Sequence, residues 1–248
     1  MRVRRSAPGP PHAASSCWSA ASIAGLPRAL CAVMTRMTTP SHLLYLHGFR
    51  SSPLSAKAQQ TATRLLAINR ARTSAGLHPV VWVCPQLPPS PRQAIGEVLQ
   101  ALQGIEPQRI ALVGSSLGGF YATWLAHHLG CRAALLNTAV NPARDLRAQI
   151  GALSAWHDPS QHFVFTQEHV EELEALQVGD LSHPVPDPWR FLAVIARDDE
   201  VLDWRESAAR YAGSALRVAD RGGHALENYA QDHLDAVLAF LGLNPAAA

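Results

Sequence analysis

One stretch, Arg109 to Gly119, constrains the fold of this chain more than any other. An apolar run, Ile110 to Val113, predicts a short buried strand. The sequence Gly-Ser-Ser-Leu-Gly follows at residues 114–118 and fits the pattern G-x-S-x-G, and a helical pattern from Leu117 to about Leu129 comes directly after it. Strand, tight turn and helix are the context in which this pattern forms a nucleophile elbow, a strained turn that exposes a serine hydroxyl at the edge of a sheet.

Ser116 is the candidate nucleophile of this turn. Ser115 is less suitable, because the positions two before and two after it are not glycine. A Cβ atom at Gly114 or Gly118 would collide with the neighbouring strand or helix, which explains why glycine stands there. The alternative is that these small residues only close a strand–helix unit, so the remainder of the chain has to decide.

The rest of the chain alternates between strand and helix patterns. Apolar runs predict further strands at 43–46, 80–83, 133–136, 191–196 and 215–218, and helices at 53–71, 94–102, 204–212 and 227–241. This alternation predicts an α/β fold with a mostly parallel sheet and helices on both faces. Residues 141–188 interrupt it, and a helical stretch at about 167–177 is interpreted there as a short cap insertion over the active site, with its apolar face packed on the domain. The predicted domain therefore covers residues 39–248, with a cap segment at about 141–188.

Residues 1–38 are rich in Ala, Ser, Pro and Arg and show no period. We expect a disordered N-terminal extension, for which Met34 and Met37 offer alternative starts of translation. A secretory signal is the weaker alternative, because Pro27 and Arg28 break the apolar region. Of the chain's 21 basic residues, five are arginines in residues 1–41, where no acidic residue occurs. The remainder is mildly acidic and has no basic stripe, which argues against a nucleic-acid partner.

The four cysteines are scattered without C-x-x-C spacing, which argues against a disulfide framework and suits a reducing compartment. We therefore expect a cytoplasmic protein. No run of about 18 apolar residues occurs, so we expect no membrane-spanning segment and no membrane partner. The histidines of the cap segment match no metal-ligand spacing. The sequence predicts neither a metal nor a cofactor.

Two later strands run into loops that carry an acid and a histidine. The strand at 191–196 leads to Asp198, Asp199 and Asp203, and the strand at 215–218 leads to Gly222, Gly223 and His224. Serine needs a base to take its proton, and the base needs a third group to fix its tautomer. The chain order Ser, acid, His is the one this fold uses. We predict Ser116, Asp199 and His224 as the catalytic residues, with Asp198 and Asp203 as the alternative acids.

An oxyanion hole needs two backbone N–H donors. We predict Leu117, the residue after the nucleophile, and Phe49, on the loop after the first strand. His47 on the same loop is interpreted as structural, because the triad already supplies a base. Arg50 could meet an anionic part of a substrate, but a solvated surface arginine is the favoured interpretation.

Several stretches are similar to the YqiA-like esterases, which are small α/β-hydrolases. The similarity spans about residues 42–243 and rests on Leu43 to Phe49, Ser51 to Ala58, Pro85 to Pro89, Val113 to Gly119 with Tyr121 to Leu125, Asp199 to Asp203, Gly222 to Ala225 and Phe240 to Leu243. The resemblance implies ester hydrolysis, with Ser116, Asp199 and His224 at the family's triad positions. Asp198 stands where that family tends to have glycine. The segment from Arg147 to Pro188 matches poorly, and we expect substrate choice to lie there.

Together these observations predict a serine hydrolase that cleaves esters or thioesters of small to medium acyl groups through an acyl-enzyme. The alternative is a slow or inactive member of the same fold that serves as a ligand-binding protein, because fold alone does not imply activity. Labelling of Ser116 without turnover of any ester would favour that alternative.

Overall fold

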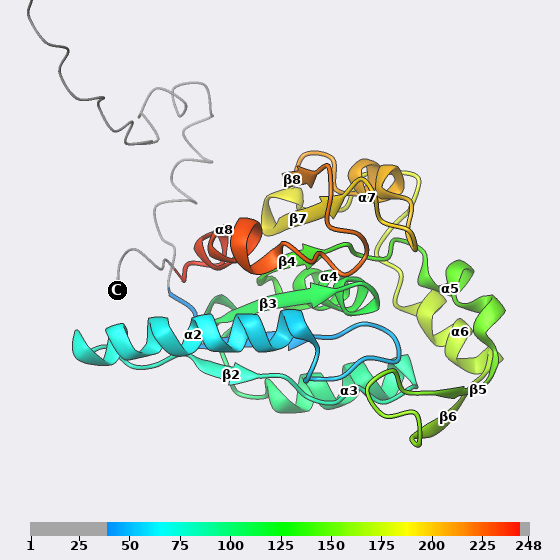
Figure 1. The fold of residues 1–248 in the computed structure, drawn as a ribbon, viewed down its shortest axis with the longest axis horizontal. Coiled ribbons are helices and arrows are strands. Elements are labelled where there is room, and N and C mark those ends of the chain that lie inside the picture. Colours follow the sequence, from blue (N-terminus) through cyan, green and yellow to red (C-terminus); the bar gives the residue numbers. More distant parts are fainter. Residues whose placement is uncertain (1–38, 244–248) are drawn as a thin grey trace, which may run out of the picture. The chain divides into compact units, whose positions relative to one another are not determined.

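A computed structural model describes residues 39–243. Its main sheet has the order β2-β1-β3-β4-β7-β8, and every neighbouring pair is parallel (Figure 1). The strands are β1 (His42–Leu46), β2 (Val81–Val83), β3 (Ile110–Ser115), β4 (Arg132–Leu136), β7 (Phe191–Ala196) and β8 (Ala215–Ala219). The parallel α/β architecture predicted from the sequence is confirmed.

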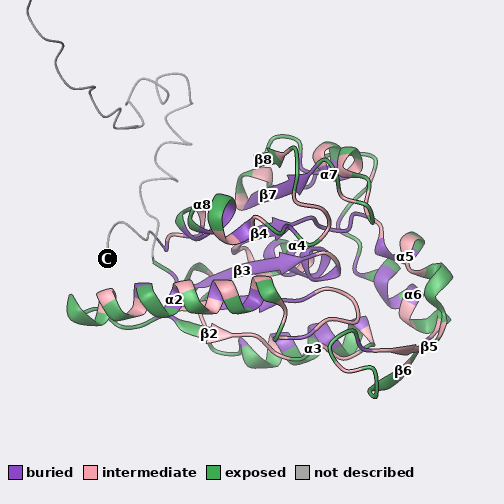
Figure 2. Ribbon diagram, viewed as in Figure 1, coloured by how far each residue is buried: buried purple, intermediate pink, exposed green. Residues whose placement is uncertain are grey.

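Helices cover both faces of this sheet, as predicted. They are α2 (Ala56–Ser74), α3 (Pro91–Ala101), α4 (Leu117–Leu129), α7 (Trp204–Arg210) and α8 (Leu234–Phe240). Alternate residues of β1 face opposite layers: Leu43 and Tyr45 pack with α2 and α8, whereas Leu44 and Leu46 pack with α3 and α4. The central strands are accordingly buried on both sides (Figure 2).

Two Ser-Pro pairs behave differently from the sequence prediction. Ser52-Pro53 was expected to begin a helix, but α2 begins only at Ala56, and the Ser52 hydroxyl instead accepts from the amide of Leu54 at 3.2 Å. Ser90-Pro91 forms the helix start that was expected at residue 94. The Ser90 hydroxyl accepts from Gln93 N at 3.2 Å, and Pro91 occupies the first turn of α3.

The helix predicted at 227–241 is shorter than expected. A π-helical turn at Tyr229–His233 precedes α8, and Gly222, Gly223 and Leu226 all have positive φ. The chain before the π-helical turn therefore stays a loop. Short 3₁₀ turns occur at Pro107–Arg109, Arg147–Gln149 and Pro188–Arg190.

The insertion between β4 and β7 contains a hairpin that the sequence analysis did not predict. It comprises α5 (Pro142–Asp145), the antiparallel pair β5 (Gly151–Ser154) and β6 (His162–Phe165), and α6 (Gln167–Ala175). Val170 and Leu173 of α6 are buried in the core of the domain, as the expected inward apolar face requires. Buried Glu172 accepts from the Ser90 hydroxyl at 2.7 Å and thereby attaches α6 to the start of α3.

The predicted extension at 1–38 lies outside the described residues, so its disorder and its start site stay predictions. Within residues 39–243, no helix has the length and apolar character needed to cross a membrane. Both cysteines of this range, Cys84 and Cys131, are free thiols.

Candidate active site

Ser116 occupies a strained turn between β3 and α4. Its backbone has φ 55° and ψ −121°, a conformation that L-residues rarely adopt. The turn is held on both sides, because Ser116 N donates to Leu136 O at 3.0 Å and Ser116 O accepts from Gly119 N at 2.9 Å. The local geometry is that of the predicted elbow.

The flanking glycines allow this close approach. A Cβ atom at Gly114 would overlap the backbone carbonyl of Gly118 in α4, and one at Gly118 would overlap the carbonyl of Leu46 in β1. The first helical turn of α4 thus lies directly on the ends of two strands. The steric argument made from the sequence agrees with these positions.

The structure brings Ser116, His224 and Asp199 into one hydrogen-bonded chain. His224 Nε2 lies 3.1 Å from Ser116 Oγ, and His224 Nδ1 lies 2.9 Å from Asp199 Oδ2. The Asp199 side chain is 2% exposed and that of His224 is 22% exposed. The acid is therefore shielded, while the imidazole borders the solvent-accessible side of the site.

The pKa of Asp199 reflects two opposing causes. Burial by itself raises the pKa of the carboxyl, but hydrogen bonds from His224 and from the amides of Leu202 and Val201 outweigh it and hold the pKa below its usual value. Both amides donate to the same oxygen, Oδ1, at 2.9 and 2.8 Å. Asp199 is thus ionised at neutral pH, with Oδ2 facing the imidazole.

The two alternative acids lie elsewhere and make different contacts. Asp198 accepts from the amides of Gly222 and Gly223 at 3.3 and 2.9 Å. Asp203 accepts from Arg205 N at 3.0 Å and caps α7. Neither carboxylate forms a hydrogen bond with His224, so Asp199 is the one of the three that contacts the imidazole.

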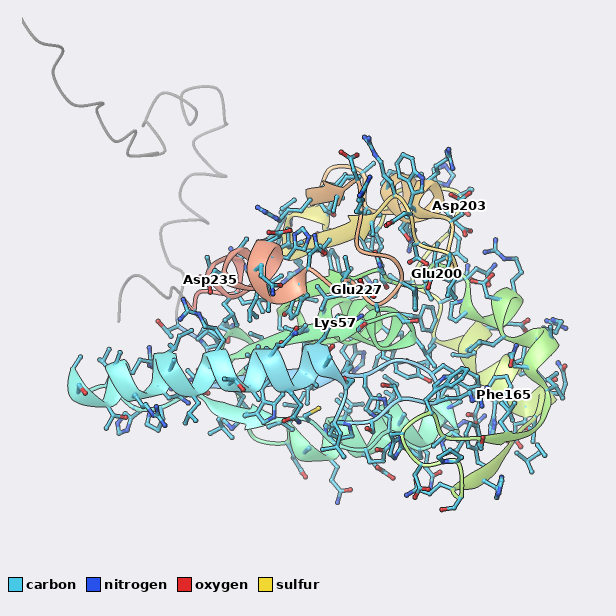
Figure 3. All side chains as sticks on the ribbon, viewed as in Figure 1. Lys57, Phe165, Glu200, Asp203, Glu227 and Asp235 are labelled. Carbon is cyan, nitrogen blue, oxygen red and sulfur yellow. The ribbon has the colours of Figure 1, made fainter. Side chains whose placement is uncertain are left out.

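The loop at residues 222–225, called here the histidine loop, is held by three side chains that the sequence analysis did not single out. Asn137 Nδ2 donates to Gly223 O at 2.8 Å, and Lys57 Nζ donates to Ala225 O at 2.8 Å. Glu200 Oε2 accepts from His224 N at 2.9 Å. Figure 3 shows Lys57 at the start of α2 and Glu200 on the loop after β7. Asn137 directly follows β4, so its position as a polar residue at a strand end could have indicated a role in the site. No local sequence pattern indicates such a role for Lys57.

Burial of Lys57 lowers its pKa to about 8, although the charge of nearby Asp199 acts in the opposite direction. Its ammonium is thus a weakly hydrated cation beside the ionised acid. Together with Asp198 and Glu200 it fixes the histidine loop through charges of both signs.

The two predicted oxyanion donors lie together. The amides of Phe49 and Leu117 donate to no acceptor within residues 39–243, and both residues line a cavity of about 470 Å³ that also contains Ser116 and His224. A second cavity of about 230 Å³ shares Phe49 and Leu117 and extends past Tyr121. Phe49 and Leu117 therefore border both cavities, which we call the serine cavity and the side cavity.

His47 has the structural role expected for it. Its Nε2 accepts from Leu87 N at 3.0 Å, while Nδ1 donates to Gly48 O at 3.0 Å. Burial lowers the pKa of His47, which favours the neutral ring that these two bonds require. It thereby connects the loop after β1 to the segment after β2.

Comparison with known proteins identifies the family and the fold. A family model described as uncharacterised protein family UPF0227 matches residues 42–242. The chain belongs to this family. The resemblance to YqiA-like α/β-hydrolases drawn from the sequence is thereby confirmed.

Solved structures show the same fold at low sequence identity. A ferulic acid complex of Est1E from Butyrivibrio proteoclasticus has a TM-score of 0.59 at 15% identity, covering 86% of this chain and 92% of that one. A hydrolase from Agrobacterium vitis S4 has a TM-score of 0.56 at 16% identity, covering 82% and 91%. Mouse alpha/beta hydrolase domain-containing protein 10 has a TM-score of 0.55 at 17% identity, covering 86% and 89%. The α/β-hydrolase fold of this family member is therefore shown.

The cap contributes to the cavities differently from the prediction. Pro142, Leu146 and Trp156 line the serine cavity, and the β5–β6 region lines the side cavity, whereas α6 contributes no residue to either. The helix expected over the active site instead supports the cap from the side of α3.

Arg50 is also not a solvated surface side chain. It is half-buried, and its guanidinium lies 4.0 Å from the centre of the Trp156 ring.

Proposed function

We propose that this protein is a serine hydrolase that cleaves carboxylic esters, or the related thioesters, through an acyl-enzyme. The observation that carries the proposal is the chain of hydrogen bonds from Asp199 through His224 to Ser116, next to two free backbone amides. This arrangement supplies a nucleophile, a base, an orienting acid and an oxyanion hole within one cavity.

In the proposed mechanism, Ser116 Oγ attacks the ester carbonyl while its proton passes to His224 Nε2. The amides of Phe49 and Leu117 donate to the developing oxyanion, where each donor contributes on the order of 10²–10³ in rate. His224 then gives the proton to the departing alcohol or thiol. A water molecule, deprotonated by the same imidazole, hydrolyses the acyl-enzyme and restores Ser116.

Asp199 has a positioning role in this proposal. Its carboxylate accepts the Nδ1 proton of His224, keeps Nε2 free to act as a base, and balances the charge of the imidazolium. No step needs a metal or cofactor.

The two cavities that meet at Phe49 and Leu117 favour a substrate with parts of unequal size, one on each side of the scissile carbonyl. A cytoplasmic location belongs to the same proposal, with the free thiols Cys84 and Cys131 in support.

The test is hydrolysis of p-nitrophenyl esters from acetate to palmitate by the wild type, Ser116→Ala and Ser115→Ala. Ser115 is buried in β3 directly beside the nucleophile and makes a matched control. Ser116→Ala should lower kcat by about 10⁴ or more, because the triad acts as a unit. Ser115→Ala should stay close to wild type. Activity that survives in Ser116→Ala would refute the proposal, and covalent labelling by a fluorophosphonate without turnover of any ester would favour a ligand-binding protein.

A further inference from the structure

Arg50 brings a fixed positive charge to the junction of the two cavities. It directly follows Phe49, the proposed oxyanion donor, and it lines both the serine cavity and the side cavity. Its backbone has φ 58°, and its carbonyl accepts from Trp156 N at 2.8 Å. The main chain at Arg50 is thus held in a conformation that non-glycine residues seldom adopt, with the side chain beside the proposed reaction centre.

The Arg50 guanidinium is oriented but its charge is not neutralised. Nε donates to Ser154 O at 2.7 Å, Nη2 lies 3.5 Å from Ser154 Oγ, and the group stacks on Trp156. In the part of the chain that the structure describes, Arg50 forms no ion pair with a carboxylate, and Nη1 donates to no protein acceptor. A guanidinium held by one edge and one face keeps its remaining N–H groups available for an anion.

The other charges in the wall of the serine cavity already have partners. Asp145 is paired with Arg144 at 2.7 Å, and the Lys57 ammonium donates to the histidine loop. A neutral substrate would leave Arg50 as an uncompensated cation in a partly desolvated site, which costs free energy. An anionic group on the substrate would compensate it.

We propose that Arg50 binds a negatively charged group of the substrate, so that the preferred esters carry an anion such as a carboxylate near the scissile bond. This inference rests on the proposed function, because it assigns a substrate class to the same site. The anion belongs either to the acyl part or to the alcohol part, since Arg50 borders both cavities. The two positions are separated by the experiment below.

The experiment compares closely matched ester pairs, in which one member carries a carboxylate and the other its uncharged methyl ester. For the acyl side, the mono-p-nitrophenyl ester of adipic acid is compared with its methyl ester, by release of p-nitrophenolate. For the alcohol side, the hexanoyl ester of 4-hydroxybenzoate is compared with that of methyl 4-hydroxybenzoate. Wild type, Arg50→Gln, Arg50→Lys and Arg70→Gln are assayed. Arg70 is exposed on α2 and lines neither cavity, so its variant controls for net charge.

We expect the wild type to favour the anionic member of one pair in kcat/KM. Arg50→Gln should reduce that preference about tenfold or more relative to wild type, because a hydrogen-bonded charge pair is lost. Arg50→Lys should fall between the two, and Arg70→Gln should match the wild type. Added salt should weaken the preference in the wild type, since a charge at a cavity mouth is screened.

Four results would overturn the inference. An equal loss on charged and neutral esters in Arg50→Gln would show that Arg50 only connects the loop to the cap through Trp156. A wild type without salt-sensitive preference in either pair would overturn the inference even if Arg50→Gln failed to fold. Turnover of neutral esters with no charge preference would refute only the anion site and would leave the proposed function standing. The absence of turnover of any ester would refute the proposed function and the inference that rests on it.

Discussion

The two neighbouring acids Asp199 and Asp198 give a sharp test of the proposed triad, through Asp199→Asn and Asp198→Asn. Oδ1 of Asp199 accepts two backbone amides, from Val201 and Leu202, and lies 3.1 Å from His224 Nδ1, while Oδ2 lies closer to the same nitrogen, at 2.9 Å. An asparagine at 199 keeps its carbonyl oxygen toward those two donors and therefore turns its NH₂ group toward His224 Nδ1. The imidazole must then accept at Nδ1 and carry its proton on Nε2, where it cannot take the proton of Ser116.

This wrong tautomer should lower kcat by about 10⁴, which corresponds to about 5 kcal/mol in the barrier. In Asp198→Asn one of two exposed hydrogen bonds to the histidine loop survives, so the loss of about 1 kcal/mol predicts at most about a tenfold effect. The assay is kcat and KM for p-nitrophenyl butyrate, with circular dichroism to verify folding. Equal losses in the two variants, or a larger loss in Asp198→Asn, would refute the tautomer argument.

Three further predictions concern stability, measured by urea unfolding. Gly118→Ala should destabilise the protein by about 3 kcal/mol or more, because its Cβ would overlap the Leu46 carbonyl. Gly96→Ala in α3 should stabilise the protein by about 0.5–1 kcal/mol, because no atom lies within 4 Å of the added Cβ. Equal effects of the two substitutions would contradict the packing argument. The folded state holds the pKa of Asp199 below its usual value, so the ionised carboxylate stabilises the folded protein above about pH 4. This stabilisation is lost as the pH falls through the lowered pKa, and Asp199→Asn should remove the corresponding part of the loss of stability in acid. The pKa of Lys57 is lowered to about 8 in the folded state, so the unfolded chain binds more protons between about pH 8 and 10.5. The stability of the wild type should therefore rise in this range by up to about 1.4 kcal/mol per pH unit relative to that of Lys57→Met. A stability difference between the two proteins that does not change with pH would contradict the buried ammonium.

The parallel sheet and the positions of Ser116, Asp199 and His224 could be predicted because their signals are local. Buried parallel strands such as β3 and β7 are continuous apolar runs, and Ser116, Asp199 and His224 lie on the segments that follow β3, β7 and β8 at the same edge of the sheet. The glycines at 114 and 118 add a steric requirement that few other turns impose. Strand order and chain order then fix which loops meet.

The contacts that distinguish one acid from another could not be predicted, because they depend on register and on distant groups. Asp198 and Asp199 are adjacent in the sequence, yet one carboxylate faces the backbone of the histidine loop and the other the imidazole. Lys57 reaches that loop across 168 positions in the sequence. The two Ser-Pro pairs also differ through a distant group. Only Ser90-Pro91 begins a helix, and there the buried carboxylate of Glu172 accepts a hydrogen bond from the Ser90 hydroxyl.

The hairpin of the cap escaped prediction because β5 and β6 have four residues each, which is too short for a strand pattern to stand out. Its effect on the site is nevertheless direct. The Phe49 ring packs edge-on against Phe163 and Phe165, with centroids 6.1 and 5.1 Å away, while the Phe49 amide is a proposed oxyanion donor. The same residue therefore gives its backbone to the chemistry and its side chain to the cap.

This shared residue separates the site into two parts with different freedom to change. The histidine loop is attached to the sheet and to α2, and no residue of the cap hairpin hydrogen-bonds to it within residues 39–243. The loop carrying Phe49 and Arg50 is attached to the hairpin through Phe163, Phe165 and Trp156. We therefore expect a change in the hairpin to shift the proposed oxyanion donor and the charge beside it, and to leave the Asp199–His224–Ser116 hydrogen bonds in place. In the proposed mechanism, substrate range and oxyanion stabilisation are thus coupled at the loop after β1, whereas proton transfer does not depend on the hairpin.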